Sequence, residues 1–448
     1  MALDVSTTPT LRAGRRTRGK NLGLLTASTA MDNAENSITT VLFPLMREAL
    51  GLSSSALGVI VAVSKAVGIF AAVPWVFLAK RFSRRAVLAT CSGFWGVWVV
   101  LAGLSSSFTQ FVVLYGIAAA GFAGAGPIAL EIMGDLYDDR RRGRATGMLY
   151  GGVAIIAGVS APLFGQLSGF DDGWRYGYVL SGCMCILIGV LVVVFLDDTR
   201  PGGGERRAGD AAAKAEEKAQ NVVAGVRELL RIKSFRYILV QRLFSGQNVI
   251  MSFGVVFLVE ERGFSTATAA IVATPFAIGY LLGTVVGGRV NDAVHRRWPA
   301  SGRVMMLQAS QLAFAAAVFV ELQTPTSSIG FFVAIFAVVG FLQGQVPVVN
   351  RPLIMAVVRP EQRALAFAVS LSTVEALAYA GYALLVGYLG DAIGLQGALL
   401  LVTAALTAVN GLCSGLLYRP YARDSAAVRD SQVVPSSYEG EPSKPDAQ

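Results

Sequence analysis

An acidic and amide-rich segment interrupts the first long apolar stretch of the chain. Asp32, Asn33, Glu35 and Asn36 crowd the middle of residues 22–45, a stretch long enough to cross a bilayer. Carboxylates in hydrocarbon are costly and rare, so acids kept there indicate a proton-carrying role. Asp32 and Glu35 are three residues apart and share one face of a helix. The alternative is a hydrogen-bonded cluster that only joins neighbouring helices.

Further polar side chains inside apolar stretches extend this candidate chemistry. Lys65 lies at a depth similar to that of Glu35 and is a candidate counter-charge for it. Glu131 is a further candidate proton carrier or gating acid, with Arg242 as a cation at similar depth; the alternative is that Glu131 reaches back to water. The residues expected to line a substrate cavity are Asn36, Tyr115, Gln247, Gln343, Gln345 and Glu375.

Metal, cofactor and enzyme sites are not expected. The only histidine, His295, lies in a polar loop. The four cysteines fall within apolar stretches, which is typical of small buried residues and not of metal ligands. The sequence contains no nucleophile–base pair and no glycine-rich phosphate loop. These observations predict a protein that is not an enzyme and needs no cofactor.

The composition indicates an all-α membrane protein. Of the 448 residues, 54% are hydrophobic and 15% are charged, whereas soluble domains have about 25% charged residues. Apolar runs near the length of a membrane-spanning helix recur along the chain. The twelve predicted spans are residues 22–45, 57–78, 86–104, 109–133, 146–167, 176–196, 237–259, 267–288, 304–322, 328–353, 364–389 and 397–418.

The spans form two similar halves. GLSSSA begins at Gly51 and GFSTAT at Gly263, 212 residues later, and the same offset places Glu35 on Gln247. A parallel repeat of this kind predicts two pseudo-symmetric six-helix bundles with a site between them near the bilayer midplane. The expected segments are a basic N-terminus, a first bundle, a linker with an amphipathic helix, a second bundle and a disordered tail: 1–21, 22–196, 197–236, 237–418 and 419–448.

Charge patterning predicts the orientation. The net charge is +9, and the basic residues gather in the N-terminus, the linker and alternate short loops. Positive loops stay in the cytoplasm, so both termini are expected there. The same placement in loops argues against nucleic-acid binding.

The loop after the second span carries a recognisable motif. VFLAKRFSRRAVL, from Val76 to Leu88, resembles the loop between spans two and three of major facilitator superfamily transporters, whose basic residues match Arg81, Arg84 and Arg85. Lys80 stands where that family has an aspartate. The second half keeps the aspartate as Asp292 and then departs through an insertion, AVHRRWPASGR. The resemblance implies a cytoplasmic gate made by Lys80, Arg81, Arg84, Arg85 and Asp292; the alternative is that these are ordinary positive-inside charges.

Four segments of the first half narrow the resemblance. MDNAENSITTVLFPLM, SGFWGVW, GDLYDDRRRGRATGMLYGG and DDGWRYGYVLSG are similar to the Spinster branch of the superfamily. Members of that branch move lysolipids, sphingolipids and related amphiphiles, often coupled to protons. The span-one aspartate of the branch falls on Glu35, and its following arginine falls on Asn36.

Together these features predict a secondary transporter of two six-helix bundles that moves an amphipathic organic molecule by alternating access, coupled to protons. We expect a monomer in a bacterial cytoplasmic membrane, with lipids, protons and the substrate as its partners. One alternative is a carrier of a small polar or anionic metabolite, for which Lys65 and Arg242 would supply fixed charges. Another is a membrane sensor that uses the fold without transport.

Overall fold

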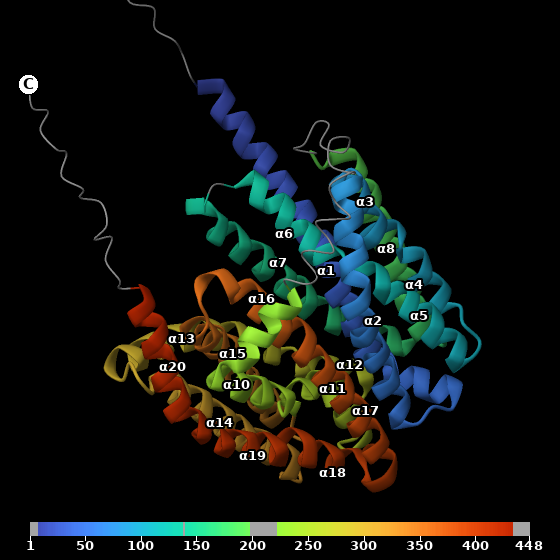
Figure 1. Ribbon diagram of the computed structural model, residues 1–448. Helices are drawn as coiled ribbons and strands as arrows, with labels where there is room; N and C mark the ends of the chain where they lie inside the picture. The colour runs from blue at the N-terminus through green and yellow to red at the C-terminus, as the bar shows by residue number, and fades with distance from the viewer. Residues whose placement is uncertain (1–7, 138, 198–221, 433–448) are drawn as a thin grey trace, which may run out of the picture.

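The computed structural model describes residues 8–137, 139–197 and 222–432, which are almost entirely helical (Figure 1). Eleven membrane-length apolar spans lie among the described residues. The twelfth predicted span lies within α1, Thr8–Leu50, a continuous helix of 43 residues. Its polar centre lowers its hydropathy without interrupting the helix. The predicted all-α membrane architecture is therefore confirmed.

The first half runs from α1 to α8. Several of its crossings are built from more than one helical segment, and serine side chains accept hydrogen bonds at the starts of α3 and α5. Its remaining elements are α2 (Ser54–Arg81), α3 (Arg84–Ala89), η1 (Thr90–Phe94), α4 (Gly96–Gly103), α5 (Phe108–Phe122), α6 (Ala125–Leu136), α7 (Asp139–Gly165), η2 (Gln166–Gly169) and α8 (Gly173–Phe195).

The second half follows a helical segment at 222–231. Its seventh crossing is interrupted: α10 ends at Leu243 and α11 starts at Ile250, with a short 3₁₀ turn between them. Its elements are α10 (Lys233–Leu243), η3 (Gly246–Val249), α11 (Ile250–Glu260), α12 (Thr266–Ala273), α13 (Pro275–Arg297), α14 (Gly302–Gln323), α15 (Ile329–Val357), η4 (Pro360–Gln362), α16 (Arg363–Phe367), η5 (Ala368–Val374), α17 (Glu375–Ile393), α18 (Leu395–Leu399), η6 (Leu400–Ala405), α19 (Leu406–Cys413), η7 (Ser414–Leu417) and α20 (Tyr418–Gln432).

Two glycines mark the internal repeat in the backbone. Gly51 and Gly263 both have positive φ, 63° and 71°, a conformation that glycine adopts without steric cost. Each is followed within three residues by the start of a membrane-spanning helix, α2 and α12. The sequence repeat at an offset of 212 therefore corresponds to equivalent turns in the two halves.

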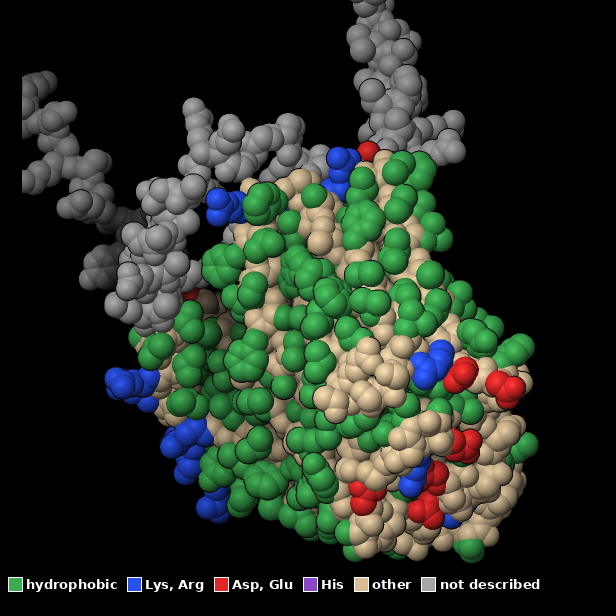
Figure 2. Space-filling view, turned by 90° about the vertical axis from the view of Figure 1, so that its right-hand side faces the viewer, with side chains coloured by type: hydrophobic (Ala, Val, Ile, Leu, Met, Phe, Trp, Pro, Cys, Tyr) green, Lys and Arg blue, Asp and Glu red, His purple; other side chains and the backbone are tan. Residues whose placement is uncertain are grey.

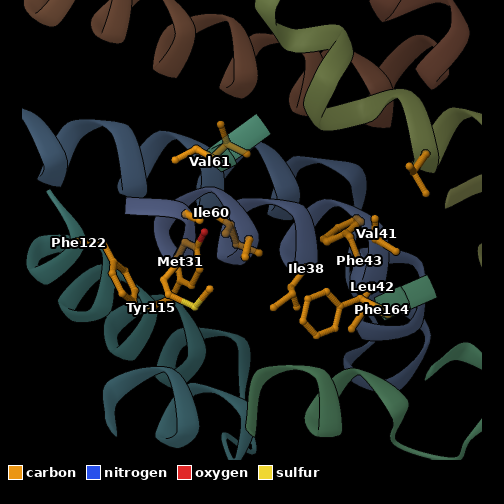
Figure 3. Packing of buried hydrophobic residues seen from close by; sticks show 14 of the residues in the cluster. Met31, Ile38, Val41, Leu42, Phe43, Ile60, Val61, Tyr115, Phe122 and Phe164 are labelled. Atoms are coloured by element: carbon orange, nitrogen blue, oxygen red, sulfur yellow. The ribbon is translucent and has the colours of Figure 1, made fainter. Parts of the chain in front are cut away.

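Large aromatic and aliphatic side chains fill the interior of the first half. Phe43, Phe111, Trp174 and Tyr178 are at most 1% exposed, and Figure 3 shows residues of α1 packed beside α2 and neighbouring helices. The outer surface is also apolar: Figure 2 shows hydrophobic side chains over the middle of one face, with charged ones toward its margins. Because lipid surrounds a spanning bundle, an apolar exterior is expected.

The C-terminal segment differs from the sequence prediction. Residues 419–432 were expected to be disordered but belong to α20, where Tyr421 is fully buried. Asp424 of α20 accepts hydrogen bonds from the backbone and hydroxyl of Ser234 at 2.9 and 2.7 Å. The polar composition of this segment suggested disorder, but its few apolar residues lie on one face of a helix that packs on the second half. Residues 433–448 lie outside the described part.

Candidate functional site

Glu35 lies inside the first half, on the buried face of α1. Its side chain is 3% exposed, and Tyr178 and Cys185 of α8 lie within electrostatic reach of it. Ser28 and Thr39 on α1 are also buried, while Asn36 is partly buried. The polar stripe of α1 thus turns toward α8 and away from the lipid-facing surface.

A hydroxyl and aromatic cluster borders Glu35. The hydroxyl of Thr39 lies 3.0 Å from the backbone carbonyl oxygen of Glu35, 2.8 Å from the Tyr178 hydroxyl and 3.2 Å from that of Tyr115. The Tyr115 ring stacks on Phe111 with centroids 5.6 Å apart, and Figure 3 shows it beside Met31. Tyr115 was predicted in the substrate cavity, but the structure places it in the packed surroundings of Glu35.

Lys65 faces the second half and not Glu35. Its ammonium group lies 5.3 Å from the ring centroid of Tyr379 on α17, and the ion pairs of the described residues do not join it to Glu35. The expected pairing rested on similar depths along two helices. Depth fixes a height in the membrane but not the direction in which a side chain leaves its helix, and α2 turns Lys65 toward α17.

Glu131 forms an ion pair with Arg84. The expectation that Glu131 faces Arg242 is therefore wrong. The Arg84 and Glu131 groups are 2.9 Å apart, and Arg84 is 6% exposed. Arg85 donates to the carbonyl oxygen of Leu196 at 3.4 Å. These bonds hold α3 to α6 and to the end of α8, within the first half. Arg84 starts α3 close to the end of α6, so it reaches Glu131 before any residue of the second half.

The other residues predicted for the gate and for proton coupling take no part in the polar contacts between helices that the structure describes. Arg81 lies against the Phe82 ring, with its guanidinium carbon 5.8 Å from the centroid. Asp292 is exposed on α13. The side chains of Asp32 and Lys80 lie outside those that the structure describes, so their roles stay predictions.

A polar cluster in the second half unites three predicted residues with one that the sequence analysis missed. Arg242 is 3% exposed and forms an ion pair with Glu375. Asn248 donates from its amide to Glu375 at 3.1 Å and accepts from the Gln343 amide. We call these four residues the central cluster; α10, η3, α15 and α17 contribute one residue each.

The interruption of the seventh crossing brings Asn248 into the central cluster. Residues 245–248 are polar or glycine inside an apolar stretch, and Ser245, Gly246 and Asn248 are weak helix formers. That run was the signal for a break, and it went unused in the sequence prediction. Gly246 packs so closely on Val402 that an added Cβ would lie 2.7 Å from its carbonyl oxygen.

A second polar row lies one helical turn from the central cluster. Ser252 follows Asn248 by four residues and Tyr379 follows Glu375 by four, and their hydroxyls are 2.6 Å apart. Lys65 of the first half caps this row through the Tyr379 ring. Polar groups of η3 and α11 therefore pair with those of α17 on successive turns, with a cation from the opposite half at one end.

The remaining predicted cavity residues lie apart from these rows. Gln247 is 1% exposed, and its amide has no hydrogen-bond partner among the described residues. Gln345 packs against Gly287 of α13. Glu321 on α14, which was not among the predicted residues, is a fully buried acid for which the described residues supply no hydrogen-bond donor. Its position near the end of an apolar stretch made it resemble an ordinary boundary charge.

We call the end of the molecule where α3 begins the basic end, and the end where α2 begins the opposite end. The two halves are bonded to each other at the opposite end. Arg47 forms an ion pair with Glu260. Asp391 of α17 accepts from the backbone N–H groups of Ser54 and Ser55 at 2.7 and 3.1 Å. In Figure 1, α2 and α17 run side by side toward this end. Among the described residues, the hydrogen bonds and ion pairs between the halves all lie here.

Comparison with known families decides the class of the protein. The family model "Major Facilitator Superfamily" matches residues 25–299 and again residues 238–440. The chain belongs to the Major Facilitator Superfamily. As a superfamily member it is a transporter that works by alternating access, and it is not an enzyme.

Individual relatives of this superfamily member cover most of its length. It is 27% identical over 433 residues to an MFS-type efflux pump of Mycolicibacterium smegmatis, covering 92% of this chain and 95% of that protein. It is also 27% identical over 276 residues to the membrane sensor protein UhpC of Escherichia coli, covering 57% and 60%. Its fold matches a bacterial homolog of the human lysosomal transporter Spinster in an inward-facing, unoccupied conformation. That match has a TM-score of 0.71 at 19% identity and covers 95% and 99% of the two chains.

Proposed function

We propose that this protein is a proton-coupled transporter of an amphipathic organic molecule, with Glu35 as its principal proton carrier. The observation that supports this role is the burial of Glu35 at 3% exposure inside an apolar bundle. A carboxylate in such surroundings is costly when charged. If Glu35 is exposed first to one side of the membrane and then to the other, it would take up a proton on one side and release it on the other. Proton movement would then be coupled to the conformational cycle.

The substrate site proposed here lies between the halves, along the central cluster and the row formed by Ser252, Tyr379 and Lys65. These residues combine polar groups with the aromatic ring of Tyr379, as expected for a molecule with a polar head and an apolar body. Lys65 comes from the first half and the other groups from the second, so a ligand bound here would contact both halves. Such shared contact is what alternating access requires.

We further propose that the basic end is cytoplasmic and that the structure represents a state closed toward the outside. The basic loops support this orientation, and the bonds between the halves lie at the opposite end. A cysteine placed at Gly203 should be protected from an impermeant thiol reagent in intact cells, whereas one placed at Asp171 should react. The reverse pattern would overturn the orientation.

The test of transport uses purified protein in liposomes that contain a pH-sensitive dye. Three probes separate the alternatives: ethidium as an amphipathic cation, lysophosphatidylglycerol as an amphipathic anion and galactonate as a small polar anion. Proton movement driven by either amphiphile, and lost in Glu35→Gln, is the expected result. Proton movement driven by galactonate alone would instead favour the metabolite carrier.

One comparison favours a second candidate, a membrane sensor, because UhpC is among the relatives. A sensor would bind its ligand without moving it. Saturable binding of a probe to the purified protein, with neither probe flux nor proton movement in the same liposomes, would favour sensing over transport.

A further inference from the structure

A cavity of about 380 Å³ lies at the basic end of the second half, apart from the central cluster. The ends of α13 and α15, the starts of α14 and α16 and one face of α20 surround it. In Figure 1, α13 and α20 lie close together at the left of the molecule. Its polar lining residues are His295, Arg303, Arg363, Tyr421, Ser425 and Arg429. Its size is within the range of small-ligand sites.

The lining carries positive charge without matching acids. Arg303, Arg363 and Arg429 contribute three guanidinium groups, and no aspartate or glutamate is found among the described lining residues. Arg303 and Arg429 both lie within electrostatic reach of His295 and Tyr421. Asp292 also acts on His295, but it points from the exposed side of α13. Like charges that converge on a cavity repel one another, and an anion bound between them would relieve that cost.

Several side-chain nitrogens around the cavity are buried and make no hydrogen bond to the described residues. The Nε atoms of Arg303 and Arg363 and the Nδ1 atom of His295 have no hydrogen-bond partner within the part of the chain that the structure describes. Other nitrogens of the same arginines are fixed: Arg303 donates to the carbonyl oxygen of Pro352 at 3.2 Å, and Arg363 donates to that of Met355 at 3.1 Å. The backbone thereby holds both guanidinium groups in place before any ligand arrives, which lowers the entropy cost of binding.

The inserted segment that departs from the family pattern, at the end of α13 and the start of α14, builds much of this cavity. The insertion AVHRRWPASGR, residues 293–303, supplies His295, Pro299 and Arg303. Trp298 in the same segment is 47% exposed, as is typical of aromatic side chains at the membrane–water boundary. Pro352, Met355 and Val428 give the cavity an apolar wall. The site thus combines a cationic pocket with an apolar wall and lies beside an exposed tryptophan.

We propose that this cavity binds a phosphate group, carried by the headgroup of an anionic phospholipid or by a soluble phosphate compound. Planar guanidinium groups bind phosphate oxygens through paired, charge-assisted hydrogen bonds. Three of them around one volume match the several acceptor oxygens of a phosphate better than the two of a carboxylate. The proposal does not depend on the transported substrate or on proton coupling, because the cavity lies within the second half alone.

The experiment measures ligand-dependent thermal stabilisation of the full-length protein in detergent. The probes are dioleoylphosphatidylglycerol, zwitterionic dioleoylphosphatidylcholine and inorganic phosphate, each titrated at constant ionic strength. The variants are Arg303→Gln and Arg429→Gln; Arg429 is exposed, so its replacement is expected to leave the fold intact. Arg419→Gln is the matched control because it removes the same charge from α20 outside the cavity.

We expect saturable stabilisation of the natural protein by phosphatidylglycerol or by phosphate, and roughly tenfold weaker binding for both cavity variants, as loss of a charge-assisted hydrogen bond implies. Arg419→Gln should bind like the natural protein. Saturation by phosphatidylglycerol alone assigns the site to lipid, and saturation by phosphate alone assigns it to a soluble compound. No saturable effect of either probe, or equal affinity in Arg429→Gln, overturns the proposal; if Arg303→Gln does not fold, Arg429→Gln decides.

Discussion

Spans one and seven occupy equivalent places in the internal repeat but differ in backbone and charge. Glu35 lies in α1, which continues through it without interruption. Its counterpart 212 residues later is Gln247, within the short turn between α10 and α11. The continuous helix places an acid against α8, whereas the interrupted one presents Asn248 to the Arg242–Glu375 pair.

The difference shows how one fold can hold two kinds of polar group inside a membrane. An acid on an intact helix leaves the backbone hydrogen bonds in place, and its charge can be neutralised by a proton. A helix break frees backbone groups, so it is tolerated where polar neighbours surround it. We therefore expect proton chemistry in the first half and polar recognition in the second, and four substitutions test this division.

The largest effect is expected from Glu35→Gln. This change keeps the shape of the side chain but fixes it in an uncharged state, so uphill transport on a proton gradient should be lost completely while substrate exchange continues. Glu48→Gln, an exposed acid on the same helix, should transport normally. Both are measured as probe accumulation and exchange in liposomes. Uphill transport that persists in Glu35→Gln would move the proton site elsewhere, with Asp32 as the next candidate.

Arg242→Gln should cause the largest loss of stability. It leaves the Glu375 carboxylate partly buried without its cation, and breaking a buried pair in this way costs about 3–5 kcal/mol. Arg236→Gln, an exposed arginine on the same helix, should cost far less. The midpoint of thermal unfolding in detergent reports both. Equal midpoints would show that the pair contributes little to the fold.

Asn248→Ala should have an intermediate effect. The change removes one donor to Glu375 and one acceptor for Gln343, a loss of about 1–2 kcal/mol. Ser245→Ala is the control from the same turn, because the Ser245 hydroxyl has no hydrogen-bond partner among the described residues. A larger destabilisation by Ser245→Ala than by Asn248→Ala would contradict the role of the central cluster.

The smallest effect is expected from Tyr379→Phe. The ring that faces Lys65 is retained, and only the hydroxyl contact with Ser252 is lost, which is worth about 1 kcal/mol. Tyr379→Leu removes the cation–π contact as well and should add about 0.5–1 kcal/mol. Tyr388→Phe on the exposed side of α17 is the control. Identical unfolding midpoints for Tyr379→Phe and Tyr379→Leu would show that Lys65 gains nothing from the ring.

The crossings and the repeat could be predicted because they depend on long apolar runs. Gly51 and Gly263, for example, mark the same turn in sequence and in backbone. The amphipathic character of α20 was missed, because its few apolar residues lie in a segment of polar composition. Hydropathy reports average composition, whereas docking of α20 depends on where Tyr421 and Asp424 point.

The sequence predicted individual residues of the candidate site better than it predicted which residues pair with each other. Arg242, Glu375 and Gln343 were identified singly as polar residues in apolar spans, and the structure brings them together. The pairs Glu35–Lys65 and Glu131–Arg242 were inferred from depth and are replaced by Lys65–Tyr379 and Glu131–Arg84. A single sequence fixes the height of a residue along its helix but carries little information about the direction of the neighbouring helix.

The contact that Asp391 makes with the start of α2 has a consequence for sequence drift in this protein. Its carboxylate accepts from the backbone N–H groups of Ser54 and Ser55, and the side chains of Ser53 and Ser55 also bond to it. Any residue except proline presents the same N–H group, so a substitution at position 53 or 55 removes a side-chain bond but leaves the backbone bonds of the closure in place. Loss of the carboxylate at position 391 removes all of these bonds at once. Tolerated substitutions are therefore expected to be unevenly distributed across this contact, rarer at position 391 of α17 than at the start of α2.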